Sequence, residues 1–199
     1  DSIVVDDNVA VITAWGANGL TGAAYVFENN AGTWVETAKL TASDATSGDM
    51  FGSSVALDDV EIVIGAIGDE EYLGAAYVFA FDGENWVETA KLTASDGTAG
   101  DRFGLSVDFD EGRAVVGSFF NKGASGQVHS GAAYVFEKTG TAWTESAKLV
   151  AIDAESQDRL GYSVAIDDNA VMAGAVGVGS DHGAAYLFNY EGGDWVELL

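Results

Sequence analysis

One stretch of sequence occurs three times in this chain, and that repetition restricts the folds available to it. The copies begin at Leu40, Leu92 and Leu149 and read LTASDATSGDMFGSSVALDD, LTASDGTAGDRFGLSVDFDE and LVAIDAESQDRLGYSVAIDD. A fixed period longer than 20 residues indicates stacked units, each of which buries its apolar faces against its neighbours. The chain is therefore best interpreted unit by unit.

Other landmarks recur with the same period. The motif GAAYVF begins at Gly22, Gly74 and Gly131, and GAAYLF begins at Gly183, at spacings of 52, 57 and 52 residues. A tryptophan follows each copy by about a dozen residues, at Trp34, Trp86, Trp143 and Trp195. The segment from Ser2 aligns with the segment from Ser163, so the chain contains four units.

Each unit has the pattern of four short strands. In the second unit, FGSSVALD alternates, VEIVIGA is a nearly continuous apolar run typical of a buried strand, and GAAYVFAF and NWVETAKL follow. Proline is absent, so Gly, Asp and Asn must supply the turns. Four-stranded units at this period predict an all-β fold, a β-propeller with one four-stranded blade per unit. The expected blades span residues 2–40, 51–92, 103–149 and 160–199.

The recurring residues resemble those of the FG-GAP repeat family, in its prokaryotic form. The FG pairs at Phe51-Gly52 and Phe103-Gly104, the GA step at Gly65 and the GAAYVF strand carry the resemblance, which covers essentially the whole chain. Such repeats build the β-propeller of integrin α-chains and of many bacterial and archaeal surface proteins. The resemblance implies a single propeller domain, residues 1–199, that acts outside the cell in binding or scaffolding, without catalysis.

The number of blades stays open at this point. Leu199 aligns with Ala38 and Asp1 with Ser53, so one linker of 14 residues separates the chain from four complete units. Propellers of the resembled family commonly have seven blades. We expect an excerpt of a larger ring, or a chain that completes its ring with a second copy; a closed four-bladed ring is the alternative.

Calcium sites are common in the resembled family, but their loop is replaced here. Short turns stand in its place, in VDDNV from Val5, LDDVE from Leu57, FDEGR from Phe109 and IDDNA from Ile166. Calcium takes six to eight oxygen ligands from a loop that can wrap around it, and two adjacent carboxylates on a tight hairpin do not supply them. We therefore predict plain turns and no metal or other cofactor, with calcium as the disfavoured alternative.

Charge and composition exclude several function classes. The chain has 32 acidic and 8 basic residues and a net charge of −24, which argues against nucleic acid as a partner. With 48% hydrophobic residues it should fold beneath an acidic surface, as in halophilic proteins, and gain stability with salt. No apolar run approaches the length of a membrane span, so insertion is not expected. Cysteine is absent, which excludes disulfides and thiolate chemistry.

Residues that recur in every unit are expected to hold the units together. GYSVA at Gly161 resembles a nucleophile elbow, but Ser54, Ser106 and Ser163 all occupy that position and no histidine recurs with them. The repeated tryptophans are predicted to pack between blades. Repeated aspartates and lysines of the linkers are interpreted in the same structural way.

The segments between the second and third strands differ from unit to unit, and they are therefore the candidate binding loops. They begin at Trp15, Ile67, Phe119 and Val176. The candidate ligand-binding residues are Trp15, Tyr72, Phe119, Phe120, His129 and His182. We expect them on one face, where aromatic residues anchor a protein or polysaccharide partner at a cell surface. In the alternative, Phe119 and Phe120 merely pack into the blade edge.

Three functional classes remain open from sequence. The favoured one is non-catalytic recognition or adhesion, and the second is a structural segment of a surface layer, stalk or filament. The third is an enzyme or its accessory domain, in which His129, His182, Asp69 and Asp181 would form a zinc or acid–base site. No complete catalytic constellation is apparent, so no catalytic residue is predicted.

Overall fold

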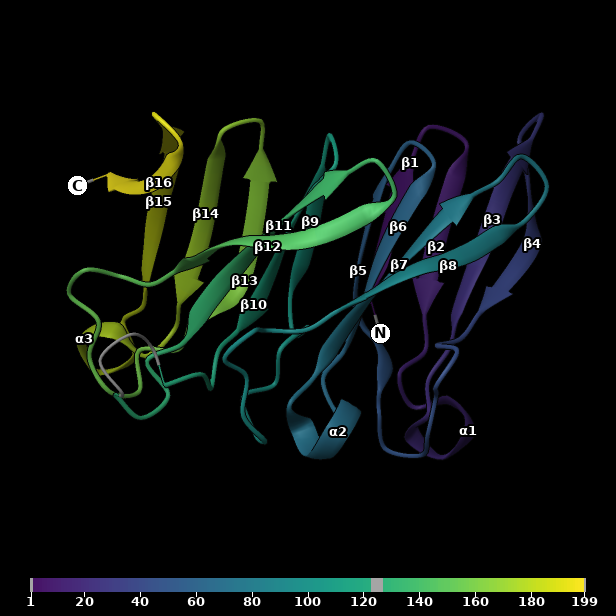
Figure 1. The fold of residues 1–199 in the computed structure, drawn as a ribbon. Helices are drawn as coiled ribbons and strands as arrows, with labels where there is room; N and C mark the ends of the chain where they lie inside the picture. Colours follow the sequence, from purple (N-terminus) through teal and green to yellow (C-terminus); the bar gives the residue numbers. More distant parts are fainter. Residues whose placement is uncertain (1, 123–126, 199) are drawn as a thin grey trace.

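The computed structural model describes residues 2–122 and 127–198, which form four antiparallel sheets of four strands each. Within every sheet the strands lie in chain order, so each unit is a simple meander. Figure 1 shows the sheets side by side in chain order, from the purple first sheet to the yellow fourth sheet. The predicted all-β class and the four four-stranded units are confirmed.

The strand bounds follow the repeat. The first sheet contains β1 (Ile3–Asp6), β2 (Val9–Thr13), β3 (Ala24–Asn30) and β4 (Thr33–Leu40). The second contains β5 (Phe51–Asp58), β6 (Glu61–Ala66), β7 (Ala75–Phe81) and β8 (Trp86–Leu92). The third contains β9 (Val107–Asp110), β10 (Arg113–Ser118), β11 (Ala132–Thr139) and β12 (Ala142–Leu149). The fourth contains β13 (Leu160–Asp167), β14 (Ala170–Ala175), β15 (Ala184–Glu191) and β16 (Asp194–Leu198).

The turns between first and second strands are two-residue hairpins. Their first residue has a left-handed backbone in every unit, at Asp7, Asp59, Glu111 and Asp168, with φ between 44° and 51°. Such a conformation suits hairpin turns whose twist matches that of the strands, and aspartate, which occupies three of the four positions, tolerates it better than most residues. Local turn chemistry therefore defines one end of each sheet.

The hydrophobic core is divided into three clusters, one at each junction between neighbouring sheets. The cluster between the first and second sheets includes Val11 and Val26 on one side and Phe51 and Ile64 on the other. Phe51 packs edge-on against Tyr77, with ring centroids 5.6 Å apart. The second and third clusters repeat this arrangement with residues of the following sheets. Stability therefore comes from packing between units rather than within one sheet.

Glycine permits the backbones of neighbouring sheets to meet. Gly22, Gly74 and Gly131 each form a parallel bridge to the first residue of the Phe-Gly or Leu-Gly pair in the next unit. A Cβ atom at Gly74 would lie 2.1 Å from the carbonyl oxygen of Phe103, closer than any real contact. The glycine that opens the GAAYVF motif is therefore required by the junction.

The repeated tryptophans have two different environments. Trp86, Trp143 and Trp195 pack at the edges of the three clusters, between their own sheet and the preceding one. Trp34 occupies the same position in the first sheet, where its side chain is 42% exposed. The predicted packing between blades therefore applies to three of the four.

The four sheets form an arc rather than a closed ring. Among the described residues, no strand pairing, bridge or hydrophobic cluster joins the first sheet to the fourth. These sheets lie at opposite ends of the molecule in Figure 1. Both carry exposed apolar side chains, such as Ile3 at 66% and Met172 at 50%. Of the architectures left open by the sequence, the closed four-bladed ring is not found among the described residues.

Candidate functional site

The connections between second and third strands lie together at one end of the molecule, which we call the loop face (Figure 1). They include the single turns α1 (Ala17–Leu20), α2 (Asp69–Tyr72) and α3 (Val178–Asp181). The third sheet has a longer connection, whose residues 123–126 lie outside the described part of the chain. All six candidate residues belong to these connections, because equivalent loops of a repeated meander lie at the same end.

The turns of the loop face are held in an unusual backbone conformation. Glu70, Glu71 and Tyr72 have φ of 46°, 59° and 65°, which is the left-handed region. Each such non-glycine residue costs about 1–2 kcal/mol. The Tyr72 carbonyl accepts hydrogen bonds from the amides of Gly100 and Arg102 in the following linker, at 3.1 and 2.9 Å. The neighbouring unit therefore fixes the shape of this turn.

A shallow apolar hollow of about 240 Å³ opens on the loop face between the first three sheets. It is lined by Trp15, Met50, Ser53, Ile67 and Leu105. Trp15 and Ile67 follow the second strands of their sheets, while Ser53 and Leu105 each follow a Phe-Gly pair. The Trp15 side chain is 39% exposed, so an indole ring is presented at the rim of an apolar surface.

Beside this hollow, aromatic rings surround the guanidinium group of Arg102. The guanidinium carbon lies 5.5 Å from the ring centroid of Tyr72, 5.9 Å from Phe119 and 5.0 Å from Phe120. Phe120 also stacks on Phe119 and on His129, with centroid distances of 4.1 and 4.5 Å. Phe119 itself is buried at 7% exposure, so it supports the cluster from beneath rather than presenting a ring to a partner.

Two arginines of the loop face have no carboxylate partner in the part of the chain that the structure describes, although the protein is strongly acidic. Within residues 2–122 and 127–198, the Arg102 guanidinium makes no ion pair, and that of Arg159 reaches the Gln157 side-chain oxygen at 3.4 Å. Arginine stacks on aromatic rings and donates to carboxylates in a planar, paired geometry. The loop face therefore combines an exposed indole, an apolar hollow and guanidinium groups.

Among the described residues, neither histidine is placed against Asp69. The Nδ1 atom of His129 lies 3.4 Å from the Gln157 side-chain nitrogen, and that of His182 contacts the Gly179 carbonyl within its own turn. Asp69 is buried, which raises its pKa, and its carboxylate lies 2.8 Å from the Lys91 ammonium. No set of three metal-binding side chains occurs among the described residues, which do not include the side chain of Asp181.

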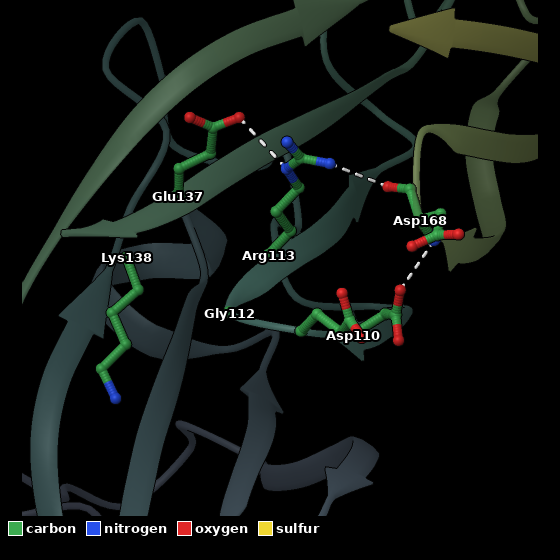
Figure 2. Close-up of a pocket in the computed structure, with 7 residues that line it drawn as sticks. Asp110, Gly112, Arg113, Glu137, Lys138 and Asp168 are labelled. Carbon is green, nitrogen blue, oxygen red and sulfur yellow. Dashed lines mark hydrogen bonds and ion pairs between the residues drawn. The ribbon is translucent and has the colours of Figure 1, made fainter.

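The acidic turns at the opposite end join neighbouring sheets. The carboxylate of Asp58 accepts a hydrogen bond from the Glu111 amide at 3.0 Å, and that of Asp110 accepts one from the Asp168 amide at 2.7 Å. Figure 2 shows the second bond in a polar hollow of about 260 Å³, where Arg113 reaches the Asp168 carbonyl at 2.9 Å. These carboxylates therefore join neighbouring sheets through hydrogen bonds.

The repeated serines also contribute to the junctions. The Ser54 hydroxyl donates to the Gly104 carbonyl and the Ser106 hydroxyl donates to the Gly161 carbonyl, both at 2.9 Å. Each bond crosses to the next sheet. The position that resembles a nucleophile elbow therefore links units, in agreement with its structural interpretation.

The sequence did not predict several residues of the loop face. Met50, Arg102, Leu105 and Tyr162 lie within or beside the recurring FG segment, which was assigned as a whole to structure. Tyr162 packs edge-on against Phe119 at 5.7 Å. A signal was present, because the residues that flank each FG pair differ between units while the pair itself recurs. Variation within the repeat, and not only between repeats, marks the loop face.

The fold and its junctions define a module of stacked β-sheet repeats, and the sequence comparison identifies the repeat. The chain belongs to the FG-GAP repeat family, whose model matches residues 34–79, 86–136 and 143–188. No curated protein matches the chain. Within the described residues, the helices are too short and too polar to cross a membrane.

Proposed function

We propose that this protein is a non-catalytic recognition module that acts outside the cell or at a cell surface and binds a partner through its loop face. Family membership supports the class, since FG-GAP repeats generally form surface and adhesion-type modules and are typically extracellular. The geometry supports the place, because the loop face holds the residues that vary between units.

One observation carries the proposal: Trp15 stands exposed at the rim of the apolar hollow. Tryptophan, tyrosine and arginine dominate the energetics of protein interfaces, and they do so beside pockets that exclude water. Tyr72 and Arg102 lie on the same face, and Arg102 is already ordered by the rings around it. An ordered arginine loses little conformational freedom when a partner binds.

The lining indicates the chemistry of the partner. An apolar side chain fits the hollow, and carboxylate or carbonyl oxygens fit the guanidinium groups of Arg102 and Arg159. A protein surface offers both kinds of group close together. A polysaccharide needs many hydrogen-bonding groups for its hydroxyls, and the lining side chains of the hollow offer two, the Ser53 hydroxyl and the Trp15 indole N–H. We therefore favour a protein partner over a polysaccharide.

The test compares two tryptophans of similar exposure. Labelled Trp15→Ala and Trp34→Ala variants are titrated onto intact cells of the source organism, with thermal unfolding as the folding control; the wild-type side chains are 39% and 42% exposed. Removing an interface anchor costs about 2 kcal/mol or more, so Trp15→Ala should bind at least about 30-fold more weakly. Trp34→Ala should bind like the wild type.

Treatment of the cells separates the partner classes. Protease should remove the binding sites, and periodate should leave them intact. The reverse result transfers the proposal to a polysaccharide. Unchanged binding by a folded Trp15→Ala variant contradicts the loop-face proposal.

A structural role without a specific ligand is the second candidate. The three well-packed junctions favour it, because they would serve a layer, stalk or filament equally well. That role predicts no saturable binding to cells, whatever the residue at position 15.

A further inference from the structure

We propose that the residue before each Phe-Gly or Leu-Gly pair determines what the loop face recognises, and that Met50, Arg102 and Arg159 together select an acidic segment of the partner. This inference rests on the proposed function for the partner being a protein. It adds the chemistry of the bound segment and the residues that distinguish it.

Met50, Arg102 and Arg159 occupy one backbone position in successive units. Each has a left-handed backbone, with φ of 56°, 57° and 62°. Their amides donate to the carbonyls of equivalent residues in the preceding connections, at 2.8, 2.9 and 3.1 Å respectively; these acceptors are Leu20, Tyr72 and His129. Glycine would be less strained in this conformation than a residue with a side chain. Because a long side chain is present in all three units, the position serves to present that side chain.

The side chain at this position changes in chemistry from one unit to the next. Met50 lines the apolar hollow beside Trp15. Arg102 and Arg159 place a guanidinium group at the corresponding points of the next two junctions. The loop face therefore has an apolar contact at the first junction and cationic contacts at the second and third.

The two guanidinium groups are available to a partner. Among the described residues, four of the eight basic side chains form ion pairs with carboxylates, namely those of Lys91, Arg113, Lys138 and Lys148. Arg102 and Arg159 form none in that part of the chain. The Nε atom of Arg159 is also buried without a hydrogen-bond partner there. A buried donor without an acceptor is costly, and a bound oxyanion would remove that cost.

The carboxylates next to the arginines in sequence are engaged elsewhere. Asp101 and Asp158 are both buried. The Asp101 carboxylate accepts hydrogen bonds from the Thr98 amide and from the Asn121 side chain, both at 2.9 Å. The Asp158 carboxylate accepts one from the Glu155 amide at 2.6 Å. These aspartates therefore hold the turns of their own linkers and leave the guanidinium groups unpaired.

One cluster of side chains connects the two arginines. The Phe120 ring lies 5.0 Å from the Arg102 guanidinium carbon and stacks on His129 with a centroid distance of 4.5 Å. The His129 Nδ1 atom lies 3.4 Å from the side-chain nitrogen of Gln157, whose side-chain oxygen accepts from Arg159 at 3.4 Å. Both guanidinium groups therefore border the same cluster, and a single segment of a partner can contact both.

An acidic peptide segment fits these groups better than a sulfated polysaccharide does. Guanidinium groups donate to carboxylates in a planar, paired geometry. A sulfated polysaccharide is charged along its whole length and would be repelled by a protein with a net charge of −24. A peptide with few carboxylates meets mainly the local cations, and it also supplies an apolar side chain for the hollow. The bound segment therefore combines an apolar residue with acidic ones.

The experiment measures binding of a defined peptide to the purified protein by fluorescence anisotropy. The labelled peptide has blocked ends and one leucine followed by glycine-spaced glutamates, and the matched peptide has glutamines in place of glutamates. The wild type should bind the glutamate peptide at least about tenfold more tightly than the glutamine peptide, since each carboxylate forms charge-assisted hydrogen bonds.

Substitutions at the shared position test each contact. Arg102→Met and Arg159→Met should each weaken binding of the glutamate peptide at least about tenfold. Both should fold, as checked by thermal unfolding, because methionine already occupies this position at Met50. Met50→Arg should strengthen binding of the same peptide about tenfold, a gain that a purely structural role does not predict.

Arg113→Met is the matched control. It makes the same substitution at the opposite end of the molecule, where the guanidinium reaches the Asp168 carbonyl (Figure 2). This variant should bind the glutamate peptide like the wild type. Equal weakening by all three arginine substitutions would attribute binding to net charge and overturn the inference.

Three further results would overturn it. The first is equal binding of the glutamate and glutamine peptides at millimolar concentration. The second is wild-type binding by folded Arg102→Met and Arg159→Met variants. The third is tighter binding of heparin than of the glutamate peptide through the same two arginines, which would assign the site to sulfate groups.

The two proposals fail separately. Loss of cell binding by Trp15→Ala, without any preference for the glutamate peptide, overturns this inference and leaves the proposed function in place. A preference for glutamate that depends on the two arginines, with cell binding unchanged in Trp15→Ala, overturns the proposed function and leaves the carboxylate site in place.

Discussion

The third and fourth sheets carry equivalent residues at equivalent positions, but only the third is covered on both faces. Val115 is fully buried and Met172 is half-exposed. Gly131 forms a bridge to the next unit, whereas Gly183 forms none among the described residues. The comparison shows that the repeated residues gain their roles from the next unit, so the repeat specifies a junction.

The segments that the family model matches also span the junctions between sheets. Each matched segment begins at the tryptophan of a fourth strand and ends in the third strand of the following sheet, as residues 34–79 do. Each matched segment is therefore displaced by one strand relative to the four-stranded sheet. Residues that touch across a junction constrain one another, and this explains why the recurring unit of sequence crosses the gap between two sheets.

The largest expected effect is the difference in stability between substitution of Gly131 and substitution of Gly183. Gly131→Ala places a Cβ 2.1 Å from the Leu160 carbonyl oxygen in a left-handed backbone with φ of 81°. We expect a loss of about 2–4 kcal/mol in the free energy of unfolding from overpacking and backbone strain together. Gly183→Ala has a similar φ of 77° and nothing closer than 3.6 Å, so its cost should be about 1 kcal/mol. Equal losses in denaturant unfolding would show that strain alone matters.

A smaller effect concerns Asp96, the linker aspartate that pairs with Lys148. Burial acts to raise the pKa of Asp96, but hydrogen bonds from Lys148 and Tyr134 outweigh it and the net pKa is lowered. The stabilisation is therefore complete above the pKa of an unfolded aspartate, about 3.9, and is lost as pH falls below it. Asp96→Asn should lower the melting temperature at pH 7, and the difference from wild type should shrink below pH 4.

Asp194→Asn is the control for Asp96→Asn, since it removes the same charge from the exposed first residue of β16 in the fourth sheet. Its melting temperature should follow the wild type across the same pH range. A difference between Asp96→Asn and wild type that stays constant with pH would argue against a role for ionised Asp96.

The smallest effect tests a single hydroxyl. Ser106→Ala removes the 2.9 Å hydrogen bond to the Gly161 carbonyl, which should cost about 1 kcal/mol. Ser163→Ala removes an equivalent hydroxyl that has no partner in the described structure, so its unfolding midpoint should stay at the wild-type value. If the two variants are equally destabilised, the hydroxyl acts within its own sheet instead of across the junction.

Much of the fold was predictable because the four units of the chain can be compared with one another. Alternation and β-branched runs define strands such as β6, and the GAAYVF copies define the period. The sequence predicted only part of the role of the acidic turns between first and second strands. Their hairpin geometry is local, but the hydrogen bond that the Asp168 amide donates to the Asp110 carboxylate joins residues 58 apart in the chain.

The loop face was predictable in position and not in detail. Trp15 and Tyr72 are exposed there as expected, at 39% and 41%. The burial of Phe119 and the aromatic surroundings of Arg102 were not predictable, because they depend on how linkers and loops of different units approach one another. Arg102 is also close in sequence to the recurring FG pair, which obscured its separate role.

Sequence alone determined the number of units, the strand order within each and the end at which the variable loops lie, because period, alternation and turn residues are local properties. Tertiary structure alone decided that the four sheets form an arc with two uncovered faces. Identical residues on the third and fourth sheets differ in burial because burial depends on the neighbour. A repeat can specify how units join, but the presence of the next unit decides whether that junction is made.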